Sequence, residues 1–221
     1  MAPVVNMTVH GIGTPHADVG ADEARTWVSV GQFEDVLDAV AGRDGIRLTF
    51  DDGNASDVEI ALPRLLERGL TAEFFLLAGR IGQPHYVDED GVRALVAAGM
   101  RIGSHGWAHR DWRRLAGAQV AQELVAAPQR LSTLSGGQVS TVAIPFGSYD
   151  RKVLAGLRRA AVTRAYTSDG GPARHGAWLQ ARTSLRHDIT PQWTDEVLAG
   201  EPGMRRQARR VAAKALKRIR G

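Results

Sequence analysis

The chain has 221 residues, of which 43% are hydrophobic and 24% are charged, and its formal net charge is +4. This length and composition are typical of one globular domain, and they exclude a disordered, collagen-like or fibrous protein. Charged or polar residues interrupt each apolar run well before the ~18 to 20 residues that a membrane-crossing helix needs. We therefore expect a single domain without a membrane span.

The amino-terminal sequence MAPVVNMTVHGIGTP has neither a basic leader nor a long apolar stretch. A secretory signal would have both, so we expect a cytoplasmic protein. The chain contains no cysteine, which excludes disulfides, thiolate metal ligands and cysteine nucleophiles. Any bound metal ion must then be held by histidine, aspartate or glutamate.

Basic residues concentrate in residues 203–221, which contain six arginines, two lysines and no acidic residue. The rest of the chain then carries a net charge of −4, so the overall basicity does not predict nucleic-acid binding. Apolar residues of this tail recur at steps of three and four, at Met204, Ala208, Val211, Ala215 and Ile219. We therefore expect a domain of residues 1–202 followed by a basic amphipathic helix of residues 203–221. That helix is either solvated or a contact for an anionic membrane surface or a partner.

Short runs of apolar and β-branched residues alternate along the chain with stretches of helical periodicity. The runs predict strands at residues 4–9, 46–50, 72–77, 101–103, 141–144 and 164–167. Helical patterns cover residues 32–40, 57–68, 90–98, 118–134 and 151–161. This alternation predicts an α/β domain in which helices cover parallel strands.

One predicted helix contains a local conflict. Ser56 and Glu59 form a capping-box pattern, whereas Pro63 falls inside the helix that they would start. Proline removes a helical hydrogen bond, so the helix either kinks at Pro63 or begins near Leu62.

Three predicted strands end in sequences that are rich in polar groups or glycine. Residues 49–53 read TFDDG, residues 103–109 read GSHGWAH, and residues 143–147 read AIPFG. Each has a simple explanation when taken alone. The first would be an Asp-Gly turn, the second a pair of structural histidines, and the third an ordinary turn. Together, however, they place two carboxylates and two histidines at the strand ends, where active sites of parallel α/β proteins lie. Histidines four residues apart can also meet one metal ion.

In this order and at these separations, TFDDG, SHGWAH and IPFG resemble the first three motifs of the polysaccharide deacetylases, carbohydrate esterase family 4. The segments VHGIGTP, LPRLLERGLTAEFFLLAGRIG and AGMRIGSH resemble the same family, so the likeness covers most of residues 4–188. The resemblance implies a distorted (β/α) barrel of about seven parallel strands and a bound divalent metal ion. It also implies hydrolysis of the acetamide on an N-acetylated sugar.

The resemblance assigns Asp52, His105 and His109 as the metal ligands. Zinc is the first choice for this set of nitrogen and oxygen ligands, which would also suit manganese, cobalt or nickel. Asp51 would act as the general base that takes a proton from water. The backbone N–H of Phe146 would stabilise negative charge on the acetyl oxygen.

The remaining assignments rest on weaker matches to the family. His187, in the sequence LRHD, is the candidate general acid, and a histidine in a surface loop is the alternative. Asp169 would orient His187, although an Asp-Gly turn explains it equally well. Trp107 and Pro145 are candidates for substrate contact, with core packing as the alternative for the tryptophan.

One departure from the family concerns the third motif, which in many members begins with an arginine that contacts the catalytic aspartate. Here Ala143 occupies that position. We expect Arg182, in the sequence WLQARTS, to make the same contact with Asp51 from another strand.

These observations predict a metal-dependent N-deacetylase that acts on a glycan or a glycan precursor. Because the third motif has no arginine, the alternative is a carbohydrate-binding protein of the same fold with little or no activity. Asp51 favours the enzyme, since a binding protein needs no general base beside the metal.

Overall fold

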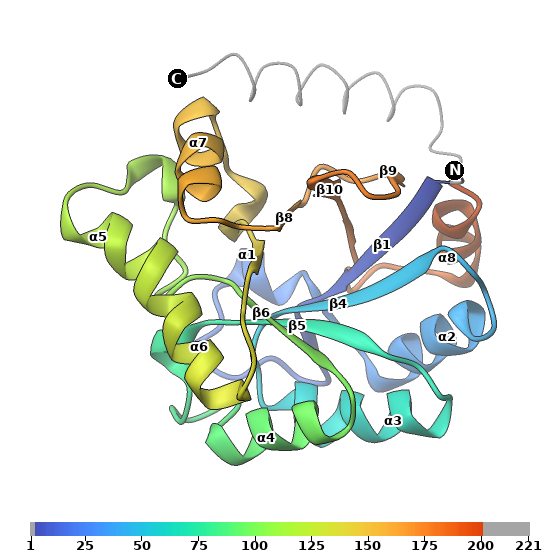
Figure 1. The fold of residues 1–221 in the computed structure, drawn as a ribbon. Coiled ribbons are helices and arrows are strands. Elements are labelled where there is room, and N and C mark those ends of the chain that lie inside the picture. The colour runs from blue at the N-terminus through green and yellow to red at the C-terminus, as the bar shows by residue number, and fades with distance from the viewer. Residues whose placement is uncertain (1–2, 201–221) are drawn as a thin grey trace.

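The computed structural model describes residues 3–200, and its main feature is a parallel sheet that curls into a nearly closed barrel with helices around it (Figure 1). The hydrogen-bonded strand order is β10-β8-β7-β6-β5-β4-β1-β11, and each neighbouring pair is parallel. The strands are β1 Pro3–Val9, β4 Ile46–Asp52, β5 Ala72–Leu76, β6 Arg101–Ser104, β7 Thr141–Ala143, β8 Arg164–Thr167, β10 Leu179–Ala181 and β11 Thr183–Ser184. The predicted distorted barrel is therefore confirmed.

The barrel closes at a single residue, Arg182, which separates β10 from β11. Strand β10 pairs with β8 at one edge of the sheet, and β11 pairs with β1 at the other. The Arg182 N–H donates to the Thr167 carbonyl over 3.0 Å, and the Arg182 carbonyl accepts from the Gly170 N–H over 2.8 Å. If β10 and β11 are counted as one interrupted strand, the barrel has the expected seven parallel strands.

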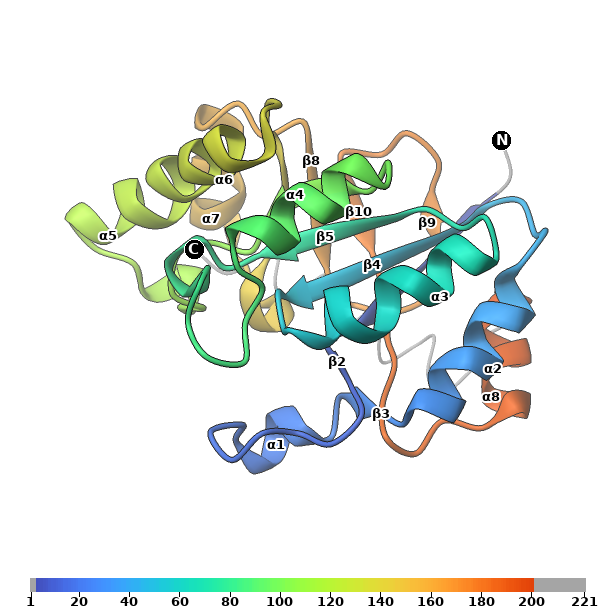
Figure 2. The ribbon, with the colours of Figure 1, turned by 90° about the horizontal axis from the view of Figure 1, so that it is seen from below.

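Helices surround the barrel, and most of them pack on the outer face of its sheet, whereas the first helix lies apart from the sheet (Figures 1 and 2). They are α1 Ala21–Ala24, α2 Val30–Val40, α3 Leu62–Glu67, α4 Glu89–Ala97, α5 Ala118–Ala121, α6 Ala127–Ser135, α7 Arg151–Arg159 and α8 Pro191–Leu198. Side-chain caps define several starts: Ser29 and Gln32 form a capping box at α2, and Asp88 and Asp150 accept backbone N–H groups at α4 and α7. Each cap satisfies a backbone donor that has no partner within the helix.

Two π-helical turns accommodate the prolines that lie within helices. The turn η1, Asp57–Ala61, precedes α3 and its Pro63, and the turn η4, Gln122–Ala126, precedes α6 and its Pro128. At the two junctions the N–H groups of Leu62 and Ala127 bond to carbonyls five residues earlier. The helix with the predicted conflict thus begins at Asp57 and continues through Pro63, because the wider turn moves the carbonyl that a proline would contact.

The elements that the sequence patterns missed are short. They are β2 Gly11–Ile12, β3 Trp27–Val28, β9 Ala173–Arg174, β10, β11, α1 and α8. Strands β2 and β3 pair with each other in parallel, and β9 pairs antiparallel with β1. Apart from the eight-residue α8, these are runs of two to four residues, which are too short to show a helical or strand period.

The core has an apolar outer layer and a polar interior. Between sheet and helices, Met7, Phe33 and Phe74 have no exposed surface. Inside the barrel, the hydroxyls of Thr8 and Thr49 lie 3.0 Å apart. Polar side chains can be buried there because neighbouring strands supply their hydrogen-bond partners.

Within residues 3–200, no helix is both long and apolar enough to cross a membrane. The predicted helix at 203–221, with its expected membrane contact, lies outside the described residues.

Candidate metal-dependent active site

A cavity of about 930 Å³ opens at the rim formed by the carboxyl ends of the barrel strands. The predicted residues Asp51, Asp52, His105 and His109 line it. Asp51 and Asp52 end β4, and His105 directly follows β6. The sequence motifs from separate strands therefore meet in one pocket.

Asp51 is held by the arginine that closes the barrel. The Nη1 and Nη2 atoms of Arg182 each donate to one oxygen of the Asp51 carboxylate over 2.6 Å, and both side chains are buried. Nη1 also lies 3.2 Å from the Thr49 hydroxyl. The contact that we expected between Arg182 and Asp51 is thus present.

Burial and the neighbouring charges set the ionisation state of Asp51. Burial opposes ionisation, but the Arg182 guanidinium outweighs it, with help from His105 and His10, and lowers the pKa of Asp51 below its usual value. Asp51 is therefore a carboxylate at neutral pH, fixed in orientation by a two-point contact.

Asp52, His105 and His109 point their ligand atoms at one another. The Oδ1 atom of Asp52 lies 3.5 Å from His105 Nε2 and 3.6 Å from His109 Nε2. Burial, with the neighbouring Asp51 carboxylate, raises the pKa of Asp52 to about 7, although His10 opposes this shift. Burial likewise lowers the pKa of His105 to about 3, and it lowers the pKa of His109 below its usual value. Both histidines are therefore neutral at pH 7, the form that binds metal.

Two further observations show that these residues fit a metal ion. The buried Oδ1 of Asp52 has no hydrogen-bond partner within residues 3–200. The Nδ1 atom of His105 lies 2.9 Å from the Ala143 carbonyl, which can only accept a hydrogen bond. The proton of His105 thus sits on Nδ1, and the Nε2 lone pair faces Asp52 and His109.

The site is built on strained backbone. Asp52, His109 and Phe146 have φ angles of 75°, 54° and 57°, in the left-handed region that side chains other than glycine seldom adopt. The Phe146 ring, which is largely exposed, lies with its centroid 4.3 Å from that of His109. Such strain persists where surrounding contacts enforce it, and it clusters at functional sites.

Glu123, from the π turn η4, fixes the loop that carries the two histidines. Its buried carboxylate accepts the N–H groups of Trp107 over 2.7 Å and Ala108 over 3.2 Å, and Arg110 lies 3.6 Å away. A β-carbon at Gly106 would lie 2.2 Å from Glu123 Oε2, so only glycine fits beside it. No sequence motif indicated this role for Glu123.

Several predicted residues lie elsewhere. His187 does not line the pocket; it is exposed, and its Nδ1 lies 3.1 Å from the Arg25 carbonyl. Trp107 packs beside Gly79, away from the pocket lining. Pro145 is buried outside the pocket lining, as the first residue of the 3-10 turn η5, Pro145–Gly147.

Asp169 does line the pocket, but it is not paired with His187. Its Oδ2 accepts the hydroxyls of Tyr149 over 2.8 Å and Thr167 over 3.0 Å. These contacts fix Asp169 as part of the pocket wall.

His10 is the functional candidate that the motifs left without a role. It follows β1, lines the pocket, and places Nε2 4.0 Å from Asp51 Oδ2. Its Nδ1 has no hydrogen-bond partner within the described residues. The available signal was position, because a histidine directly after the first strand reaches the same rim as the end of the neighbouring strand.

Replacing Glu123 by alanine should destabilise the protein and weaken metal binding together. The change leaves two loop N–H groups without their acceptor, so we expect the free energy of unfolding to fall by about 2 to 4 kcal/mol. Urea unfolding and metal titration measure the two effects. The exposed Glu67→Ala variant is the control and should change the stability by less than about 0.5 kcal/mol. Equal stability of both variants would contradict this role for Glu123.

Replacing either His105 or His109 by alanine should empty the metal site. Each supplies one of three ligands, so its loss removes a large share of the binding free energy. Metal content after dialysis, measured by mass spectrometry, tests this. Asp51→Asn is the matched control, because Asp51 is not a ligand and the variant should keep its metal. Full occupancy in both histidine variants would refute the assignment.

Comparisons with known proteins agree with this arrangement. The family model described as polysaccharide deacetylase matches residues 39–165. Protein YxkH of Bacillus subtilis (strain 168), whose name assigns it provisionally to the polysaccharide deacetylases, is 23% identical over 141 residues, which are 64% of this chain and 50% of YxkH. The chain thus spans about half the length of this curated relative.

Solved structures show the same fold. The Streptococcus pyogenes deacetylase PplD in complex with acetate superposes with a TM-score of 0.79 at 17% identity, over 91% of this chain and 99% of PplD. IcaB from Ammonifex degensii gives a TM-score of 0.72 at 22% identity, over 90% of this chain and 96% of IcaB. Because the family model matches more than half of the sequence, this chain belongs to the polysaccharide deacetylase family.

Proposed function

We propose that the protein is a metal-dependent hydrolase that removes the N-acetyl group from an N-acetylated amino sugar. The observation that carries this proposal is the position of the Asp51 carboxylate, whose Oδ2 lies 3.9 Å from Nε2 of His105 in the candidate metal set. An oriented base beside a metal set with three protein ligands is suited to hydrolysis. Membership of the deacetylase family and the acetate complex of PplD support the same reaction.

Asp52, His105 and His109 would hold the ion, and zinc is our first choice for these ligands. When bound, a divalent metal supplies Lewis acidity that polarises the acetyl carbonyl and lowers the pKa of water. Asp51 takes the proton of the attacking water, and Arg182 keeps Asp51 aimed at it. The Phe146 N–H is the candidate donor to the acetyl oxygen as negative charge develops there.

The departing amine needs a proton, and we assign this step to His10. His10 lines the pocket beside Asp51, whereas the exposed His187 lies outside the pocket lining. A general acid must come within hydrogen-bond reach of the leaving group. The geometry therefore favours the histidine after β1 over the one in the LRHD sequence.

The structure gives no support to the alternative of a binding protein without activity. That alternative rested on Ala143, which replaces the arginine that many family members have in the third motif. In this chain Arg182, which lies between β10 and β11, makes a two-point contact with Asp51. The base is thus oriented without an arginine at position 143.

The charge of the pocket rim favours a substrate without phosphate. Asp22, Glu23, Asp188 and Glu196 line the cavity, whereas the described lining residues include two arginines, Arg182 and Arg186, and no lysine. An acidic cleft repels anions and attracts cations. We therefore infer that a neutral or partly deacetylated sugar oligomer fits better than a nucleotide-linked or lipid-diphosphate-linked sugar.

Acetate release from N-acetylglucosamine oligomers tests the function. The zinc-loaded protein should act faster on neutral and partly deacetylated oligomers than on nucleotide-linked N-acetylglucosamine. Asp51→Asn should keep its metal and lose roughly two to four orders of magnitude in rate, because a positioned base is lost. A rate within about tenfold of the parent would show that Asp51 is not the base. Full metal content without acetate release from any substrate would favour the binding protein.

Paired variants distinguish the two candidate acids. His10→Gln should lower kcat on the acetamide substrate by roughly 100-fold or more, whereas His187→Gln should leave it nearly unchanged. An aryl acetate ester has a good leaving group that needs no acid, so His10→Gln should lose much less activity on the ester. An equal loss on both substrates would indicate a structural role for His10. The opposite pattern between the variants would assign the acid to His187.

A further inference from the structure

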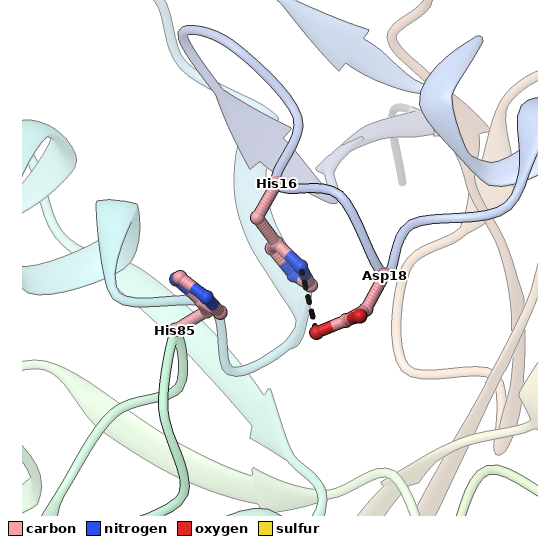
Figure 3. Close-up of side chains that lie close together, drawn as sticks. All are labelled: His16, Asp18 and His85. Atoms are coloured by element: carbon pink, nitrogen blue, oxygen red, sulfur yellow. Dashed lines mark ion pairs between the residues drawn. The ribbon is translucent and has the colours of Figure 1, made fainter.

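A second group of metal-binding side chains lies outside the catalytic pocket. His16 and Asp18 follow β2, and His85 lies in the loop between the 3-10 turn η2, Ala78–Arg80, and helix α4. One ligand atom from each of the three lies within 4.8 Å of the others. None of the three residues lines the catalytic cavity. Figure 3 shows the two imidazoles stacked, with the Asp18 carboxylate facing His16.

His16 is the fixed member of the group. Its side chain is 11% exposed, and the rings of Trp27 and Tyr86 contact it edge-on, each with a centroid distance of 6.0 Å. Neither ring nitrogen has a hydrogen-bond partner within the described residues. The Oδ2 atom of Asp18 lies 4.0 Å from Nδ1, which is too far for a hydrogen bond. A buried polar group without a protein partner requires an explanation, and a bound ligand is one.

His85 and Asp18 are the exposed members of the group. The ring of His85 stacks on His16 at a centroid distance of 4.5 Å and an interplanar angle of 10°. The backbone of His85 has a φ of 70°, and its carbonyl accepts the Ala55 N–H over 2.9 Å.

We propose that His16, Asp18 and His85 bind a second divalent transition-metal ion, of which zinc is the best fit. Two imidazoles and one carboxylate suit zinc, nickel or copper, whereas magnesium and calcium prefer oxygen ligands alone. On binding, the His85 ring must rotate out of its stack on His16, because a metal lies near the plane of each imidazole that it contacts. This site is independent of the proposed deacetylase activity.

The second site binds more weakly than the catalytic set. At a tetrahedral ion, ligand distances of ~2.0 to 2.2 Å place neighbouring ligand atoms roughly 3.3 to 3.6 Å apart. Asp52 already meets this range, at 3.5 and 3.6 Å from the two histidines, whereas Nδ1 of His16 and Oδ2 of Asp18 in the second group are 4.0 Å apart and must move closer. Ordering its two exposed side chains costs further free energy.

An ion at this site would join two segments that are connected to the catalytic pocket. The segment after His16 carries Asp22 and Glu23 of the pocket rim. The loop of His85 is bonded to the residues after Asp52, since the Val87 N–H donates to the Gly53 carbonyl over 2.9 Å. Occupancy would therefore stabilise the mouth of the pocket without touching the reacting groups.

Zinc titration of the full chain in a metal-buffered solution tests the proposal. The parent should bind two equivalents of zinc with different affinities. The His105→Ala, His109→Ala double variant should retain the weaker equivalent alone. Adding His85→Ala to that double variant should weaken the remaining affinity at least about tenfold, because a lost ligand costs no less than a lost supporting contact.

His175→Ala is the matched control, because His175 is exposed and belongs to neither group of ligands. In the same double-variant background it should leave the weaker affinity unchanged. Since His85 is exposed, its replacement should not prevent folding, and circular dichroism verifies this. Asp18→Asn provides a second, equally exposed variant. Unchanged zinc binding in both the His85→Ala and the Asp18→Asn variants would overturn the proposal.

Discussion

The buried ion pair between Arg182 and Asp51 is the interaction on which the site depends. Removing one partner of such a pair leaves an uncompensated charge in the interior, which costs about 3 to 5 kcal/mol. The pair is further enclosed by aromatic side chains, since the guanidinium carbon lies 5.3 Å from the Phe75 ring centroid and 5.6 Å from that of Tyr166. Arg182 is also the residue at which the two edges of the sheet meet. Charge, packing and barrel closure are therefore coupled at one position.

Ala143 and Arg182 contact the same two aromatic rings in the interior of the barrel. The small Ala143 side chain packs with Phe75 and Tyr166, the same rings that contact Arg182. A large side chain at position 143 would compete with Arg182 for that volume, because protein interiors are close-packed. Meanwhile the backbone of Ala143 keeps a role in the site, since its carbonyl fixes the proton of His105. Asp51 thus receives its guanidinium contact from Arg182, between β10 and β11, and not from the strand of Ala143.

The sequence predicted those parts of the fold and the site that depend on local patterns. The six strands and the ends that carry TFDDG and SHGWAH were recognisable because alternation and spacing are encoded within a few residues. His187 shows where this reasoning stops, because LRHD gave no information on which way its imidazole points, and the structure places it against the Arg25 carbonyl. His10 lies in the segment VHGIGTP, but only the structure shows it beside Asp51. Glu123 contacts a loop that is distant in sequence, and it sits in no recognisable pattern. The π turns before Pro63 and Pro128 likewise follow from hydrogen-bond geometry that composition does not reveal.

The position of Arg182 has a consequence for the order in which the molecule becomes functional. All three candidate metal ligands and Asp51 lie in the segment from β4 to the loop after β6, whereas Arg182 is separated from Asp51 by 131 residues in sequence. A partly folded chain could gather the ligands early, because they come from neighbouring strands, yet its base would lack a counter-ion until the last strand docked between β8 and β1. Burial without that counter-ion favours the protonated carboxyl group, which cannot accept a proton from water. Docking of this strand thus also supplies the charge that keeps Asp51 ionised.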